Sequence, residues 1–224
     1  MRLFRSKSLI IIILALLITA CNQDIPRILI IGDSISIGYT PFVKENLLHK
    51  ADVLHNPGNA QHTGTGLEKI DEWIGDGNWD IVQFNWGLWD LCFRHPDSKI
   101  QGNRDKENGV ITYTIDEYAA NLDSIVTILK TKTKAKLIFV TTTYVPENEA
   151  GRFINDAISY NEAAIKIMRK HLIDVNDIYE KSIPIHQEFG MGLDNVHYSK
   201  QGYEKLGELV SKSLITEIKS IQSK

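Results

Sequence analysis

Residues 27–38 read Arg-Ile-Leu-Ile-Ile-Gly-Asp-Ser-Ile-Ser-Ile-Gly. The apolar run from Ile28 to Ile31 stops at Gly32-Asp33-Ser34, which is typical of a buried strand that ends in a tight turn. Thr40 and Pro41 then predict a helix start, because threonine caps helices well and proline suits the first helical position. Ser34 is therefore expected at the carboxyl end of a strand, where open α/β folds hold their ligands.

Strand-like runs and amphipathic segments alternate along the rest of the chain. Strands are predicted at 27–32, 52–55, 80–85, 136–144 and 172–175. Two capping boxes, Thr65 with Glu68 and Thr114 with Glu117, predict helix starts, and a last helix is expected from about Ser199. Residues 91–113 are polar and aperiodic, as in a long functional loop. This alternation predicts an α/β protein, a three-layer α/β/α sandwich with about five parallel strands in flavodoxin-like order.

The first twenty residues differ from the rest in composition. They carry three basic residues, Arg2, Arg5 and Lys7. An apolar run from Leu9 to Ile18 follows, which is typical of a secretory leader and short for a membrane span. Residues 18–21, Ile-Thr-Ala-Cys, resemble a bacterial lipoprotein cleavage box, although a chance cysteine after an ordinary signal peptide is the alternative. We expect a lipoprotein signal peptide at 1–20, a tether at 21–26 and one domain at 27–224.

The resemblance to a lipoprotein implies that Cys21 is lipidated and that the protein is exported and anchored to a membrane, in the bacterial periplasm or on the cell surface. Cys92 then has no partner for a disulfide. The net charge of −3 gives no electrostatic help in binding nucleic acid, so no nucleic-acid partner is expected. His62 and His95 lack metal-ligand spacing, and the chain has no Gly-x-Gly-x-x-Gly motif; no metal or cofactor is predicted.

Three residues form a candidate nucleophilic site. A serine needs a base to take its proton, and a histidine needs a third group to hold its ring. Asp194 and His197 are three residues apart, directly before the last helix, and this turn is expected at the same sheet edge as Ser34. Asp194 would then hold one nitrogen of His197 while the other nitrogen faces Ser34.

Gly32-Asp33-Ser34, the Asp194-x-x-His197 spacing and the α/β alternation between them resemble the SGNH (GDSL-type) hydrolases over residues 27–215. The resemblance implies an esterase with Ser34 as nucleophile, His197 as base and Asp194 as its orienting group. It also implies an oxyanion hole made from the serine N–H, a glycine N–H and an asparagine amide.

The chain departs from the family pattern at the oxyanion hole. Gly87-Leu88-Trp89-Asp90 stands where the family has Gly-x-Asn-Asp, so tryptophan replaces the asparagine. Asn85 is the nearest amide, and we assign the oxyanion role to Asn85 rather than Trp89. Gly58 is the nearest glycine after the second strand, although the family glycine usually falls later, at residues 60–62.

The sequence thus predicts a serine esterase that releases short acyl groups, above all acetyl groups from carbohydrate. Trp86 and Trp89 are expected to face sugar rings, and Arg94 is expected to bind substrate; burial of either tryptophan in the core is the alternative. A lysophospholipase or thioesterase of the same fold is the runner-up function. A non-catalytic carbohydrate-binding lipoprotein is the alternative from another class.

Overall fold

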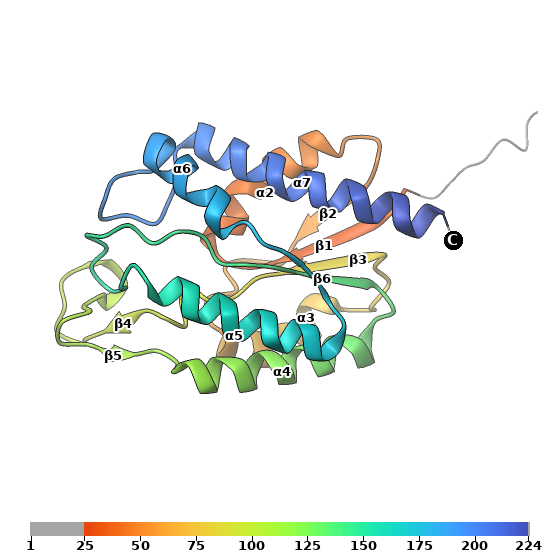
Figure 1. Ribbon diagram of the computed structural model, residues 1–224. Helices are drawn as coiled ribbons and strands as arrows, with labels where there is room; N and C mark the ends of the chain where they lie inside the picture. The colour runs from red at the N-terminus through yellow and green to blue at the C-terminus, as the bar shows by residue number, and fades with distance from the viewer. Residues whose placement is uncertain (1–24, 224) are drawn as a thin grey trace, which may run out of the picture.

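The centre of the molecule is a five-stranded parallel sheet in the order β2-β1-β3-β6-β7 (Figure 1). The computed structural model describes residues 25–223. The five strands are β1 (Arg27–Ile31), β2 (Asp52–His55), β3 (Ile81–Phe84), β6 (Lys136–Val140) and β7 (Asp174–Asn176). The predicted five parallel strands in flavodoxin-like order are confirmed. The four apolar residues of β1 that follow Arg27 are all buried, as expected for a strand covered on both faces.

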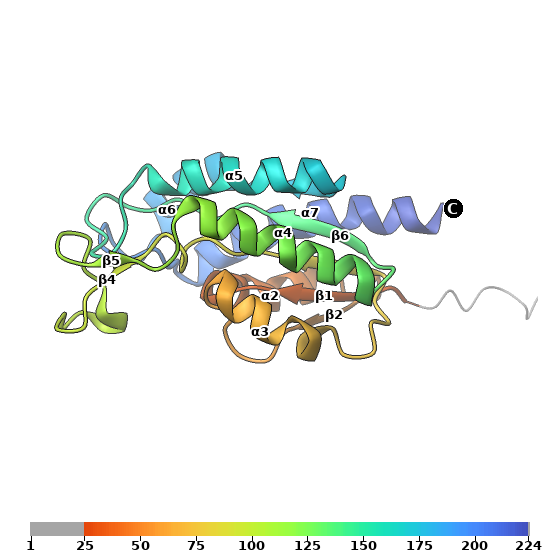
Figure 2. The same cartoon turned by 90° about the horizontal axis from the view of Figure 1, so that it is seen from below.

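Helices cover both faces of this sheet. One face carries α2 (Ser34–Asn46), α6 (Tyr179–Phe189) and α7 (Lys200–Gln222), and the other carries α3 (Thr63–Ile74), α4 (Ile115–Lys132) and α5 (Asp156–His171). Figure 1 shows the sheet between these two helical layers, and Figure 2 shows the layer of α3, α4 and α5 in front of the sheet. The three-layer α/β/α sandwich is therefore confirmed, and α6 is a helix that the sequence pattern did not predict.

Helix α2 begins seven residues earlier than Pro41 suggests. Asp33 is its N-cap, and the Asp33 side chain accepts a hydrogen bond from the Ile35 N–H. Pro41 lies inside the helix, where Thr40 Oγ1 donates to the Ser36 carbonyl at 2.6 Å. The predicted start at Thr40 is wrong because Asp33 caps equally well and proline is tolerated in this helix. Ser34 consequently occupies the first helical position.

The two predicted capping boxes had different outcomes. Thr114 and Glu117 form a capping box at the start of α4. Helix α3 starts earlier than predicted, because the ring of His62 accepts from the Thr65 N–H and serves as the N-cap. Within residues 91–113 the chain forms a small antiparallel hairpin of β4 (Phe93–Arg94) and β5 (Val110–Ile111), with the short η1 turn (Gln101–Asn103) between them.

Close packing of α2 against α7 fixes the two segments that flank the candidate site. A Cβ atom on Gly38 would lie 2.2 Å from Cε1 of Tyr203, and one on Gly207 would lie 2.7 Å from Cβ of Phe42. Only glycine permits so close an approach at these two positions. Because Ser34 begins α2 and His197 lies just before α7, this contact sets the distance between them.

The predicted leader, residues 1–20, and the predicted lipidation site Cys21 lie outside the described residues. Within residues 25–223, no helix is both long enough and apolar enough to span a membrane. Cys92 is a free, buried cysteine.

Candidate active site

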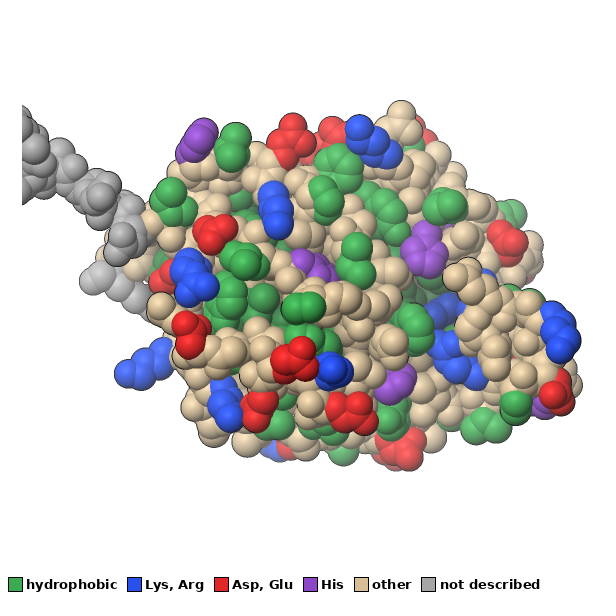
Figure 3. Space-filling view, turned by 180° about the vertical axis from the view of Figure 1, so that it is seen from behind, with side chains coloured by type: hydrophobic (Ala, Val, Ile, Leu, Met, Phe, Trp, Pro, Cys, Tyr) green, Lys and Arg blue, Asp and Glu red, His purple; other side chains and the backbone are tan. Residues whose placement is uncertain are grey.

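A pocket of about 390 Å³ opens at the carboxyl ends of the strands, beneath the β4–β5 hairpin. This size is in the usual range for small-molecule sites. The space-filling view shows basic side chains within a hollow toward one end of the molecule (Figure 3). The pocket is lined by Asp33, Ser34, Asn59, Leu88, Trp89, Arg94, Gln101, Gly102, Arg104, Arg152, Asn195, Val196 and His197. Most of these side chains are polar, and three of them are arginines.

Ser34 and His197, which are 163 residues apart in the chain, meet in this pocket. Nε2 of His197 lies 3.0 Å from Oγ of Ser34. Ser34 is half-buried at the N-terminus of α2, and His197 is half-buried on the turn before α7. This distance allows the histidine to take the serine proton.

The other nitrogen of His197 contacts Asn195, not Asp194. Oδ1 of Asn195 accepts the backbone N–H of His197 at 3.0 Å and lies 2.7 Å from Nδ1 of the ring. The Asn195 atom that accepts the backbone N–H is the amide oxygen, which can only accept hydrogen bonds, so Nδ1 is the donor and the proton of the neutral ring sits there. The lone pair of Nε2 therefore faces Ser34.

Asp194 does not occupy the position expected from the sequence. Its side chain is exposed, while Asn195 holds the ring. The Asp-x-x-His spacing would place Asp194 and His197 on one side of a regular helical turn. Residues 190–195 instead form an irregular turn in which Gly192 has φ of 128°, and this turn points Asp194 outward. The expected Asp194–His197 pair is corrected to Asn195–His197.

The surroundings of His197 favour its neutral form. Burial lowers the pKa of His197 below its ordinary value of 6.5, and the positive charges of Arg152 and Arg104 lower it further. A neutral imidazole at pH 7 is the form that can accept a proton. The pocket thus keeps its candidate base ready to act.

A second serine–histidine pair lies nearby but does not reach the pocket. Oγ of Ser36 is 2.7 Å from Nε2 of His55 and also donates to the Asp33 carbonyl at 2.7 Å. Ser36 is only 1% exposed, whereas Ser34 lines the pocket. A substrate can therefore approach Ser34 and not Ser36.

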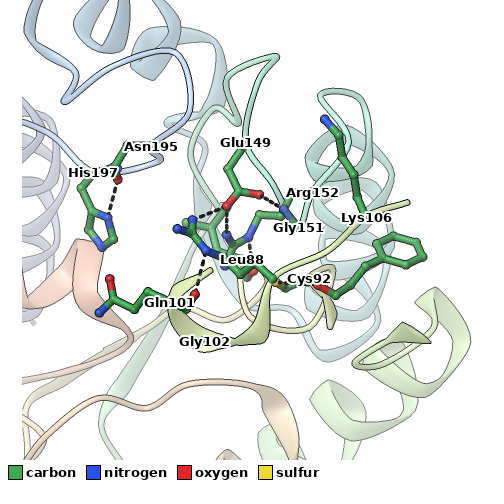
Figure 4. A network of polar contacts seen from close by, with 12 residues as sticks. Leu88, Cys92, Gln101, Gly102, Lys106, Glu149, Gly151, Arg152, Asn195 and His197 are labelled. Atoms are coloured by element: carbon green, nitrogen blue, oxygen red, sulfur yellow. Dashed lines mark hydrogen bonds and ion pairs between the residues drawn. The ribbon is translucent and has the colours of Figure 1, made fainter. Parts of the chain in front are cut away.

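A buried carboxylate organises the arginines. Glu149, which is fully buried, pairs with Arg104 and with Arg152, the latter at 2.9 Å. Oε2 of Glu149 also accepts the Gly151 N–H, and Arg152 Nε donates to the Leu88 carbonyl at 2.6 Å. Figure 4 shows these contacts gathered around Glu149, with His197 and Gln101 beside them. The network holds two guanidinium groups rigidly at the pocket wall.

Two of the three predicted substrate-binding residues lie in the pocket, and the third lies in the core. Trp89 and Arg94 line the pocket, and the Arg94 guanidinium lies 4.7 Å from the centre of the Trp89 ring. Trp86 is fully buried and donates to the Ala60 carbonyl, so the expectation that it faces substrate is wrong. Its indole ring packs in the hydrophobic core against Trp73 and Phe84.

Asn85 and Gly58 also lie away from the predicted site. The Asn85 amide donates to the Val140 carbonyl at 2.7 Å and is 8% exposed, at the end of β3 and outside the lining of the Ser34 pocket. Gly58 is exposed and lines a different surface pocket beside His55. The structure therefore supports neither residue as an oxyanion donor.

Asn59 is a pocket residue that the sequence did not single out. Its Oδ1 accepts the Gln61 N–H at 2.8 Å, which leaves its NH₂ group as the donor at the pocket wall. Gln61 has φ of 51°, a left-handed conformation that usually favours glycine, and it lies where the family glycine was expected. The loop thus has a glycine-like backbone at a position where the sequence has no glycine.

Comparison with known proteins agrees with this geometry. Residues 28–210 match the family model for the GDSL-like lipase/acylhydrolases, so the chain belongs to that family and is an ester-bond hydrolase. The sequence has no significant match among curated proteins.

Solved structures share the fold at low sequence identity. A lipase/acylhydrolase from Enterococcus faecalis has a TM-score of 0.67 at 21% identity, over 84% of this chain and 95% of the other. An acetylxylan esterase from Geobacillus stearothermophilus has a TM-score of 0.65 at 20% identity, over 84% of this chain and 93% of the esterase chain. A putative acylhydrolase from Bacteroides fragilis has a TM-score of 0.63 at 16% identity, over 88% of this chain and 90% of the acylhydrolase chain.

Proposed function

We propose that this chain is an exported serine esterase that removes short acyl groups, above all acetyl, from carbohydrate. The observation that carries the proposal is the 3.0 Å contact between Ser34 Oγ and His197 Nε2, on a ring whose Nδ1 is held by Asn195. These three residues reproduce the arrangement that makes a serine nucleophilic, with an amide oxygen in place of the usual carboxylate.

The proposed reaction has two steps. His197 Nε2 takes the Ser34 proton as Oγ bonds to the ester carbonyl carbon, and the imidazolium then protonates the departing alcohol. A water molecule, which gives its proton to His197, next attacks the acyl-enzyme and releases the acid and free Ser34. Both steps need only groups already in the pocket and water.

The developing oxyanion needs preformed donors. The N–H of Ser34 lies in the first turn of α2, where amides have no partner within the helix. We assign the second donor to the NH₂ of Asn59, which lines the pocket beside Ser34 and is oriented by its own bond to Gln61. Asn59 thus takes the role that the family gives to the asparagine of Gly-x-Asn-Asp, where this chain has Trp89.

The choice of a short acyl group rests on the pocket wall. Its apolar members are few, with Leu88, Val196 and the Trp89 ring among a mostly polar set. A fatty acyl chain would need a longer apolar groove, which disfavours the lysophospholipase and thioesterase alternatives. Two of the similar structures are described as acetylxylan esterases, and this supports acetylated carbohydrate as the substrate class.

The non-catalytic alternative is a carbohydrate-binding lipoprotein that kept the fold. The Ser34–His197 contact and the family match both favour an enzyme. Hydrolysis of p-nitrophenyl acetate tests the proposal. Ser34→Ala and His197→Ala should each abolish activity, and the double variant should be no worse than either single one, because the residues act as a unit. A folded wild-type protein that hydrolyses no ester would favour the binding-protein alternative, and activity that survives in both single variants would overturn the assignment of Ser34 and His197.

We further propose that the protein is exported and anchored through Cys21, which lies outside the described residues. The basic and apolar leader and the cysteine that follows it support this proposal. Cys21→Ser should release the protein from the membrane fraction of the expressing bacterium. A wild-type protein that is already free of membranes would contradict the anchor and leave the esterase proposal intact.

A further inference from the structure

We propose that the substrate carries an anionic group, a carboxylate or a phosphate, close to the scissile ester, and that Arg94, Arg104 and Arg152 bind this group. This proposal rests on the proposed esterase function, because it assigns a substrate class to the same pocket. The proposed substrate differs from a neutral acetylated sugar in its charge, and the effect of that charge on hydrolysis can be measured.

Arg152 is the best-fixed of the three arginines. Its side chain is only 5% exposed, yet it lines the pocket that contains Ser34 and His197. Nε donates to the Leu88 carbonyl and Nη1 to Glu149, so the plane of the guanidinium has a single orientation. A planar donor group held in this way is suited to an oxyacid anion.

Arg104 and Arg94 approach the same space from the β4–β5 hairpin. Arg104 donates to the Gln101 carbonyl and to Glu149. Arg94 stacks on the Trp89 ring and donates to the Gly102 carbonyl through Nη1. Both residues line the pocket with Gln101 and Gly102. Within residues 25–223, Nη2 of none of the three arginines donates to a protein acceptor, so each arginine has a terminal donor left for a ligand.

The charges in and beside the pocket do not balance. Three arginines line the pocket against one carboxyl group in the lining, that of Asp33, and Glu149 pairs with two of the arginines. Glu149 lies behind the wall, and Asp33 is 1% exposed and caps α2. The accessible face of the pocket is therefore positive, in a chain whose net charge is −3. Such a local reversal of sign attracts an anionic ligand to the site.

The charges of two of these arginines also affect His197, the candidate base. Arg152 and Arg104 contribute to the lowered pKa of His197, which means that their charges lie near the candidate base. An anion that neutralised these charges would be held within the same pocket as the ester, rather than at a remote surface site. Guanidinium groups bind carboxylates and phosphates through paired hydrogen bonds, and both anions fit this chemistry.

Matched acetylated sugars test the proposal with the intact mature chain. Methyl 2,3,4-tri-O-acetyl-glucopyranosiduronate carries a carboxylate, and the corresponding uronamide is its neutral isostere. The 6-phosphate of methyl 2,3,4-tri-O-acetyl-glucopyranoside provides the phosphate arm. Release of acetate gives kcat/KM for each compound. We expect a preference of about tenfold or more for one anionic sugar over the uronamide, as charge-assisted hydrogen bonds provide.

Arginine variants locate the preference within the protein. The preference should fall at least about threefold in Arg94→Gln and in Arg104→Gln, because each removes one charged donor. Arg169→Gln is the matched control, since Arg169 is an exposed residue of α5 and does not line the pocket. The measured quantity is the ratio of anionic to neutral kcat/KM within each enzyme, so a general loss of activity does not imitate the effect.

The outcomes separate this proposal from the esterase proposal. A preference for the uronate identifies a carboxylate ligand, and a preference for the sugar phosphate identifies a phosphate ligand; both support the anion subsite. Equal kcat/KM for the charged and neutral sugars, or a preference that survives both arginine substitutions, would overturn it while the esterase function stands. Failure to hydrolyse all three sugars and p-nitrophenyl acetate would overturn the esterase function itself.

Discussion

Oδ1 of Asn195 lies 2.7 Å from Nδ1 of His197, and Asp194, the neighbouring carboxylate, is exposed to solvent. The amide oxygen fixes the ring with its proton on Nδ1, because an amide oxygen can accept hydrogen bonds but cannot donate one. The neutral amide does this without placing a negative charge beside the imidazolium that forms during the reaction. The candidate triad is therefore Ser34, His197 and Asn195.

The role of Asn195 can be tested against that of Asp194. Asn195→Ala should lower kcat for p-nitrophenyl acetate by ~10²-fold or more, because His197 loses the group that orients its ring as a base. Asp194→Ala should leave kcat nearly unchanged, since its side chain faces solvent. The reverse pattern, a large loss in Asp194→Ala alone, would show that Asp194 orients His197 during catalysis.

The oxyanion assignment predicts a kcat effect at Asn59. Asn59→Ala should lower kcat by ~10²–10³-fold with little change in KM, as for a donor that is used only in the transition state. Asn85→Ala is the matched control, because the Asn85 amide is already bonded to the Val140 carbonyl. Steady-state kinetics on p-nitrophenyl acetate decides between them, and a selective kcat loss in Asn85→Ala would restore the assignment made from sequence.

The lowered pKa of His197 predicts the acid side of the pH profile. The base must be neutral to accept the Ser34 proton, so kcat/KM should remain high as the pH falls to 6.5 and decline only below it. Arg104→Gln removes one positive charge that lowers this pKa, and it should move the acid limb to higher pH. Arg169→Gln should not move it. An acid limb above pH 6.5 in the wild type would contradict the environment described for His197.

Glu149 should be important for stability as well as for the pocket. Glu149→Ala leaves two arginines without their buried counter-charge, and breaking a buried pair costs about 3–5 kcal/mol in the free energy of unfolding. Glu72→Ala breaks an exposed pair with Lys69 and should cost less than about 1 kcal/mol. Urea denaturation of both variants measures the difference. Equal stability losses would mean that Glu149 does not hold the arginine network together.

The sheet was predictable because its central strands are short, mostly apolar runs, and the first of them ends at turn formers. Ile28 to Ile31 illustrates this, since the run is fully apolar and Gly32 follows it at once. The start of α2 was not predictable from the proline rule, because Asp33 and Thr40 are both good N-caps and only the packing of the fold selects Asp33. Local preference gives several candidate boundaries, and tertiary structure chooses among them.

The candidate site was predictable only in part, for a similar reason. Ser34 and His197 follow from motif and position, since both lie at turns expected on one edge of the sheet. The partner of His197 depends on the backbone of an irregular turn around Gly192, which side-chain spacing does not encode. The arginine cluster joins the hairpin to Arg152 and Glu149, which follow β6, and no periodicity connects these segments.

Covalent labelling of the intact protein by a fluorophosphonate probe tests the central claim, that Ser34 is a nucleophile activated by His197. Peptide mass spectrometry should find one adduct, on Ser34, and labelling should disappear in Ser34→Ala and in His197→Ala. Ser36→Ala is the matched control, because Ser36 has its own histidine contact at 2.7 Å but is buried away from the pocket, and this variant should still be labelled. An adduct on Ser36, or a folded wild-type protein that takes up no probe, would contradict the account.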